Sequence, residues 1–124
     1  MRIPILRLRN VLMTSLQVDL TDQDIIDFQT DLLKMAADIN ADGAVIDITG
    51  LEVVDSFMAR VLNDTASMVR LLGTEVVITG MHPSVAITLI EMGRELIGVE
   101  TALNLDQGIE KVQRLKKEAR HGDQ

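Results

Sequence analysis

The chain is short, acidic and free of cysteine. It has 124 residues, of which 47% are hydrophobic, and its formal net charge is −7 at pH 7. This length suits one domain with one core. A negative surface argues against nucleic-acid binding, which needs positive charge. Without cysteine, disulfides, thiol catalysis and thiolate metal sites are excluded.

The sequence also lacks the marks of a membrane or secreted protein. No apolar run reaches the ~20 residues that cross a bilayer. The opening MRIPILRLRN is too short and too interrupted by arginine to be a secretory signal. We therefore expect a cytoplasmic protein.

The first twenty residues predict a β-hairpin. Residues 3–8 and 11–18 have the composition of strands, and the pair Arg9-Asn10 separates them. A gap of this length suits a tight turn, in which Asn10 can take a positive φ.

A helix is predicted to follow from Thr21. Acidic residues crowd its first turns, where they meet the positive end of the helix dipole. Gly43 is expected to end it. The apolar residues at helical spacing on its predicted buried face are Ile25, Phe28, Leu32, Met35, Ala36 and Ile39.

Two short apolar runs predict strands that are buried on both faces. Residues 44–48 and 75–79 are nearly unbroken apolar segments, which is typical of a parallel sheet covered by helices. Between them, a helix is predicted to start near Asp55 and to close at Gly73. Its predicted buried stripe is Met58, Val61, Leu62, Thr65, Met68, Val69 and Leu72.

The remaining sequence predicts two more helices and an edge strand. Pro83 stands at a plausible first helical position, and Gly93 ends that helix. Residues 98–103 suit a short edge strand. Asn104 and Gln107 resemble a capping box for a last amphipathic helix, whose apolar positions are Ile109, Val112 and Leu115.

The predicted fold class is α/β. We expect a single domain over residues 1–124, with a mixed sheet of four or five strands made of an N-terminal hairpin plus parallel strands. About four helices pack on this sheet through right-handed crossovers. Residues 119–124 are expected to form a frayed tail.

One serine stands at the predicted start of a helix. In open α/β sheets, sites collect where strands end and helices begin. Turning the helix by about 100° per residue places Ser56 on the exposed side, in line with Arg60, Asn63 and Ser67. Phe57 falls at the border between buried and exposed.

The pair Asp55-Ser56 also has a plain structural interpretation. Oxygens of both residue types accept hydrogen bonds from the free N–H groups at a helix start. Asp55 alone can do this, which leaves Ser56 free. The sequence by itself leaves capping and a functional hydroxyl as open alternatives.

Catalysis has little support in the sequence. A nucleophilic serine needs a base within hydrogen-bond reach. Of the two histidines, His121 lies in the predicted tail and His82 precedes Pro83, where a role at a helix start is expected. The G-x-S-x-G elbow of hydrolases is absent around Ser56. We therefore expect no enzyme activity.

Other ligand motifs are missing as well. Asp47 lies at a strand end, like the phosphoacceptor of response-regulator receivers, but the paired acids and the lysine of receivers are absent. We expect Asp47 to organise a loop. No Walker loop or G-x-G-x-x-G follows a strand, so no cofactor is expected. The segment 84–92 is short of polar surface, which favours packing or a protein contact.

Several segments together resemble the STAS domain family, which includes the bacterial antagonists of anti-sigma factors. They are the hairpin, AVIDITGLEVVDSFMARVL (44–62), EVVITGMHPSVAITLIEMG (75–93) and ETALNLDQGIEKV (100–112). The family's mark is an Asp-Ser or Asp-Thr pair after the second long apolar strand, here Asp55-Ser56, with T-G-x-x-P after the next strand. The continuation with Phe57 and Met58 is similar to the small stressosome members of the family.

The resemblance implies a regulatory module without catalysis of its own. It implies co-assembly with RsbR-type STAS proteins into a stressosome that holds an RsbT-type serine kinase. The kinase would phosphorylate Ser56 and leave, and a dedicated phosphatase would reset the site. A homodimer is the expected building block, and Asp55, Phe57 and Arg60 are the expected kinase contacts.

Two other functions stay open from the sequence. The first is a free anti-anti-sigma factor that binds an anti-sigma kinase directly. The second is a STAS module that binds a nucleotide or lipid, for which the sequence shows no pocket.

Overall fold

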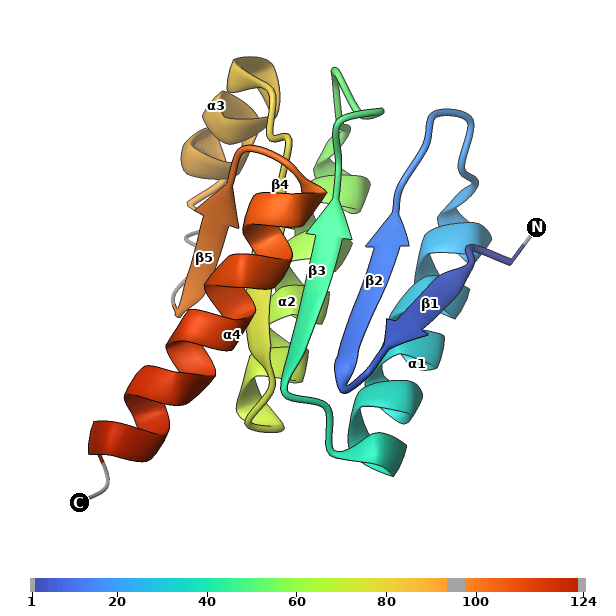
Figure 1. The fold of residues 1–124 in the computed structure, drawn as a ribbon. Helices are drawn as coiled ribbons and strands as arrows, with labels where there is room; N and C mark the ends of the chain where they lie inside the picture. Colours follow the sequence, from blue (N-terminus) through green and yellow to red (C-terminus); the bar gives the residue numbers. More distant parts are fainter. Residues whose placement is uncertain (1, 94–97, 123–124) are drawn as a thin grey trace.

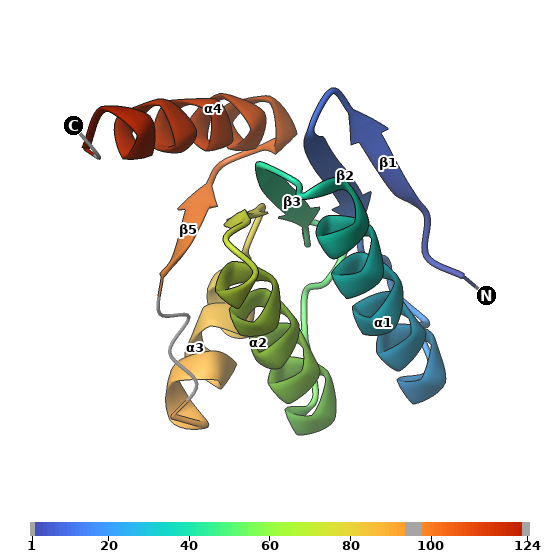
Figure 2. The same ribbon diagram turned by 90° about the horizontal axis from the view of Figure 1, so that it is seen from below.

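The computed structural model of the chain describes residues 2–93 and 98–122. One sheet lies between helices on its two faces (Figures 1 and 2). The elements in chain order are β1 (Ile5–Leu8), β2 (Val11–Ser15), α1 (Asp22–Ile39), β3 (Gly43–Asp47), α2 (Ser56–Leu71), β4 (Glu75–Thr79), α3 (Pro83–Glu91), β5 (Val99–Ala102) and α4 (Leu105–Gly122).

The sheet is mixed and five-stranded, with the order β1-β2-β3-β4-β5. β1 and β2 are antiparallel, and the other neighbouring pairs are parallel. The carboxyl ends of β2, β3 and β4 therefore lie at one edge of the sheet, where the connections to α1, α2 and α3 begin (Figure 1). The predicted fold class is confirmed, with five strands and four helices in the described residues.

The hairpin turn occupies the predicted residues but takes a different conformation. Leu8 pairs with Val11, which leaves Arg9 and Asn10 as the turn. Within this turn the positive φ falls at Arg9 (56°), so the prediction for Asn10 is wrong. The reason is tertiary, because the Asn10 side-chain amide donates to the Asn40 carbonyl oxygen at 3.0 Å and ties the turn to the end of α1.

Helix α1 starts as predicted and stops earlier than predicted. The Thr21 hydroxyl accepts from the Asp24 N–H at 3.0 Å, and the Asp24 carboxylate accepts from the Thr21 N–H at 3.0 Å. That second bond lowers the pKa of Asp24. Asn40, with φ 49°, ends the helix in a left-handed conformation. Gly43, expected to be the stop, begins β3, where any Cβ would collide with Val112 of α4.

The strands alternate between two cores on opposite faces of the sheet. The larger core lies on the side of α1, α2 and α3 (Figure 2) and includes Leu12, Phe28, Ile46, Leu62 and Ile78. The smaller core lies under α4 and consists of Val11, Val45, Val77 and Val112.

The buried face of α2 differs from the predicted stripe. Met68 and Leu72 are 40% and 43% exposed, whereas Ala59, Asn63 and Ala66 are buried. The other predicted positions of the stripe are buried or half-buried. The face is rotated because α2 packs against α1 on one side and α3 on the other, as well as against the sheet (Figure 2).

The last three elements follow the predictions closely. Pro83 is the first residue of α3, and Gly93 follows its end with φ 67°. β5 is an edge strand beside β4. The Asn104 side-chain Oδ1 accepts from the Gln107 N–H at 3.0 Å at the start of α4. α4 continues to Gly122, so residues 119–122 of the expected tail are helical, and residues 123–124 lie outside the described residues.

Candidate functional site

Ser56 is the first residue of α2, and its side chain is exposed. Asp55 is the N-cap, and its carboxylate accepts a hydrogen bond from the Met58 N–H at 2.7 Å. Within the part of the chain that the structure describes, the Ser56 hydroxyl makes no hydrogen bond. Asp55 therefore caps α2, and the Ser56 hydroxyl remains available to a partner.

The neighbours of Ser56 combine an aromatic ring with a cation. Phe57 is half-buried, and the Arg60 guanidinium carbon lies 5.5 Å from the centroid of its ring. This is the geometry of a cation–π contact, one residue along the chain from the serine. The exposed line ends there, because Asn63 is buried and Ser67 is half-buried, contrary to the prediction that both continue it.

Asp47 organises the loop that leads to Ser56, as predicted. One of its carboxylate oxygens accepts from the Thr49 hydroxyl at 2.9 Å and from the Thr79 hydroxyl at 2.8 Å. A backbone hydrogen bond joins the same two segments, because the Ile48 N–H donates to the Thr79 carbonyl oxygen at 2.9 Å. The first residues of the loop are thereby tied to β4.

The start of α3 holds the same loop from the other side. His82 is the N-cap residue of α3 but makes no side-chain cap bond. Its Nε2 lies 2.8 Å from the Thr49 carbonyl oxygen, and since a carbonyl only accepts, Nε2 carries the proton. The Ser84 hydroxyl donates to the Glu52 carbonyl oxygen. The histidine expected at a helix start therefore positions the loop before Ser56.

The T-G-x-x-P segment has a steric explanation. Gly80 has a φ of 72°, and a Cβ at this position would collide with the Thr49 side chain. The glycine lets the β4–α3 connection approach the Asp47–Thr49 segment. Sequence reasoning found the motif but did not assign these contacts to Thr49, His82 and Ser84, because the partners lie far apart in the chain.

The site presents an exposed serine hydroxyl with an exposed valine nearby in the chain. Val53, two residues before the cap, is a 77% exposed apolar side chain in the loop that leads to the serine. Over residues 2–93 and 98–122, no three potential ligands among His, Cys, Asp and Glu gather to hold a metal ion. In the same part of the chain, no helix is both long and apolar enough to span a bilayer.

The fold and this site define the class of protein. Residues 2–107 match the STAS domain family, and the chain belongs to that family. Its expected resemblance to the stressosome members is also confirmed. A serine-to-glutamate variant of RsbS from Moorella thermoacetica has a similar structure, with 42% sequence identity and a TM-score of 0.85, covering 94% of this chain and 99% of that one.

Two further proteins support this relationship. A chain from the solved stressosome, described as a signal integration and transduction hub, is 45% identical with a TM-score of 0.80, and the match covers 90% of this chain and 97% of that one. The RsbT co-antagonist protein RsbRA of Bacillus subtilis is 36% identical over 66 residues, which are 53% of this chain. The match spans only 24% of RsbRA.

Proposed function

We propose that this protein is a cytoplasmic, non-catalytic scaffold component of a stressosome. It co-assembles with RsbR-type STAS proteins, sequesters an RsbT-type serine kinase and releases it when the kinase phosphorylates Ser56. A dedicated phosphatase resets the serine, and the cycle controls the general stress response. The observation that carries the proposal is the exposed Ser56 hydroxyl, which is free while Asp55 caps the helix.

The fold can accept a phosphate at this position. A phosphoserine carries about 1.5 to 2 negative charges at neutral pH. At the N-terminus of α2 these charges meet free backbone N–H groups and the positive end of the helix dipole. Phosphorylation should therefore leave the structure of the domain intact.

The same phosphate is unfavourable inside an interface with the kinase. It adds charge beside the exposed Asp55 carboxylate and the half-buried Phe57 ring. Taking this charge out of water without a basic partner costs binding free energy. A loss of about 3 kcal/mol weakens binding about a hundredfold, so the switch acts on affinity without refolding.

Phosphorylation by the cognate kinase tests the site. With ATP, we expect one phosphate on the wild-type protein, located on Ser56 by mass spectrometry, and none on Ser56→Ala. Ser67→Ala is the matched control on the same helix and should be phosphorylated normally. Phosphate at another residue, with Ser56→Ala modified like the wild type, contradicts the assignment.

Kinase binding tests the surface around the serine. Asp55, Phe57 and Arg60 are proposed to contact the kinase, so Phe57→Ala should weaken binding about tenfold in calorimetry. Leu71→Ala is the control, because Leu71 is 86% exposed at the other end of α2. Equal binding by both variants would place the kinase elsewhere.

The size of the assembly separates this function from that of a free anti-anti-sigma factor. Mixing the protein with an RsbR-type partner should give a megadalton-scale particle in sedimentation velocity. A species no larger than a dimer under all conditions would favour the free antagonist, which binds an anti-sigma kinase directly.

A further inference from the structure

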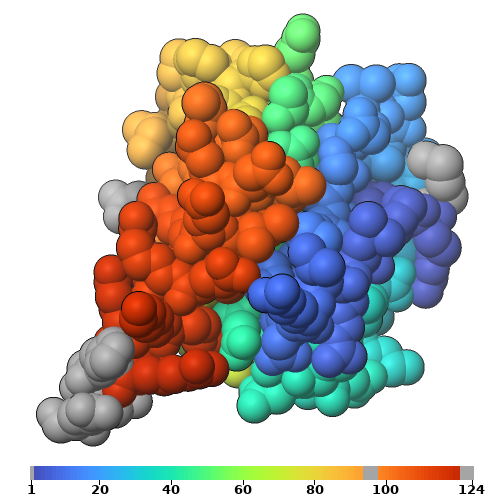
Figure 3. Space-filling model, in the orientation of Figure 1, coloured from blue at the N-terminus to red at the C-terminus, as the bar shows by residue number. Residues whose placement is uncertain are grey.

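Among the described residues, no helix covers the hairpin on the α4 face of the sheet. α4 lies over β3, β4 and β5 (Figure 1), while the blue hairpin remains at the surface beside it (Figure 3). Leu6 pairs with Met13 and Leu8 with Val11, so both leucines point to the same face as the small valine core. Leu6 and Leu8 are 63% and 52% exposed.

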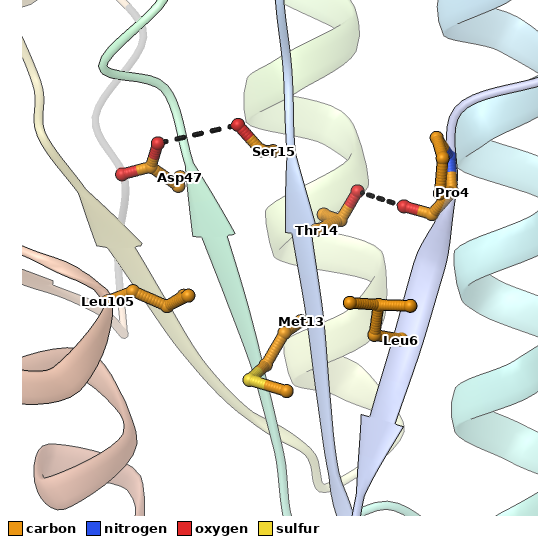
Figure 4. Close-up of a pocket in the computed structure, with 7 residues that line it drawn as sticks. All are labelled: Pro4, Leu6, Met13, Thr14, Ser15, Asp47 and Leu105. Carbon is orange, nitrogen blue, oxygen red and sulfur yellow. Dashed lines mark hydrogen bonds between the residues drawn. The ribbon is translucent and has the colours of Figure 1, made fainter.

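A groove of about 350 Å³ lies between this hairpin and the start of α4. Its size is at the lower end of the range for small-molecule sites. Figure 4 shows Asp47 and Ser15 at one end, with Met13 towards the other and Leu6 and Leu105 on opposite sides. The lining residues are Pro4, Leu6, Met13, Thr14, Ser15, Asp47 and Leu105.

Asp47 is the one charged residue among those that line the groove. One of its oxygens already accepts two short hydrogen bonds, from the hydroxyls of Thr49 and Thr79. Within the described part of the chain, the other oxygen accepts from the Ser15 hydroxyl alone, at a long 3.5 Å. The Ser15 oxygen also accepts from the Gln17 amide at 2.7 Å, so the hydroxyl is held by Gln17 while its donor bond to Asp47 stays long. This second carboxylate oxygen keeps the capacity for a stronger donor.

We propose that the groove binds a small amphiphilic cation with a primary ammonium group and a short alkyl chain. The ammonium donates to the second oxygen of Asp47, since an ammonium offers donors and no acceptor. The alkyl chain lies between Leu6, Met13 and Leu105, which removes apolar surface from water on both sides. An anion of the same size is disfavoured by the carboxylate.

The groove is separate from the proposed phosphoacceptor Ser56, and Asp47 is the residue that links the two. The Asp47 carboxylate that would receive the ammonium also holds Thr49, at the start of the loop that leads to Ser56. The inference does not depend on phosphorylation, and its test needs no kinase.

Titration with three six-carbon ligands tests the charge preference. Hexylammonium, hexanol and hexanoate are added to isotope-labelled protein, and the methyl signals of Leu6, Met13 and Leu105 are followed by NMR. We expect hexylammonium to bind about tenfold more tightly than hexanol, and hexanoate to bind more weakly than either. Equal affinities for the amine and the alcohol would overturn the proposal.

Substitutions locate the binding. Asp47→Asn is isosteric and keeps an oxygen to accept from Thr49 and Thr79, so the loop is preserved while the charge is lost. In this variant the affinity for hexylammonium should fall to that for hexanol. Leu6→Ser should weaken the binding of hexylammonium and of hexanol about fivefold, since it removes one apolar wall of the groove. Leu8→Ser is the control on the same strand and face, outside the groove lining, and should change neither.

Two results would assign the groove differently. A preference for the amine that survives in Asp47→Asn places the cation at another carboxylate and overturns the site. If sedimentation shows a wild-type dimer that Leu6→Ser converts to monomer, while no ligand shifts the groove signals, the occupant is a second copy of the chain and the ligand proposal is wrong.

Discussion

The two faces of the sheet are built from the same strands but are covered differently. Alternation places Ile46 under α1, α2 and α3, while its neighbour Val45 lies under α4. The first face buries large side chains such as Phe28 and Leu62. The second buries four valines and leaves the hairpin leucines exposed.

The difference shows how α4 can approach the sheet closely. At Gly43 an added Cβ would collide with Val112, and at Gly108 it would lie 2.8 Å from side-chain atoms of Val45 and Thr79. Glycines at both points, together with small valines, bring one helix onto three strands. The face with three helices supplies most of the burial and presents Ser56. The face with one helix keeps room for a groove.

The largest expected effect on stability lies on the face of the sheet that α1, α2 and α3 cover. Leu62 is fully buried, so Leu62→Ala should lower the free energy of unfolding by about 2–5 kcal/mol in urea denaturation. Val112→Ala, on the face that α4 covers, removes less apolar volume, and we expect it to lower the free energy of unfolding by about 1–2 kcal/mol. A cost for Val112→Ala that equals that of Leu62→Ala would break the comparison.

The next largest effect on stability is expected at the contact between β3 and α4. Gly43→Ala should destabilise the protein by about 1–3 kcal/mol, because the new methyl group overlaps Val112. Combining it with Val112→Ala makes room for that methyl group. The double variant should then cost clearly less than the two single costs added together in a double-mutant cycle. Simple additivity would show that α4 does not sit this close to β3.

A smaller effect on stability is expected at the start of α2, on the face of the sheet that α1, α2 and α3 cover. Asp55→Ala removes the carboxylate that accepts from the Met58 N–H, and we expect a loss of about 1 kcal/mol in the free energy of unfolding. Asp55→Asn keeps a capping oxygen and should stay close to wild type. If the asparagine variant loses as much as the alanine variant, capping is not the main structural role of Asp55.

The smallest effect concerns α1 and depends on pH. Because the pKa of Asp24 is lowered in the folded protein, its contribution to stability is present above the unfolded value of about 3.9. It is lost as pH falls through the folded value. Urea midpoints measured from about pH 5 down to about pH 2 should decline less steeply in Asp24→Asn than in the wild type. Parallel declines would show that Asp24 titrates alike in both states.

Much of the fold and part of the site follow from local signals. Thr21 with Asp24, Asp55 before Ser56, and Pro83 each mark a helix start through contacts within one turn. Such contacts need no information from the rest of the chain. For the same reason the exposure of Ser56 and the half-burial of Phe57 agree with the helical rotation.

The errors fall where distant segments meet. Asn63 is buried because α2 is flanked by two helices, and Met68 is exposed because the buried face is rotated towards them. The positive φ of Arg9 accompanies the tie from Asn10 to the end of α1. Periodicity describes one helix at a time, so it cannot tell how many neighbours that helix has.

The amino-acid sequence by itself determined the order of the strands and helices, where most of them begin, and that a capped helix begins with an accessible serine, because propensity and capping act between residues close in the chain. Only the tertiary structure decided that His82 and Ser84 hold the loop before that serine, and that a groove opens between β1 and α4. Those features depend on distances between segments that only the packed core brings together.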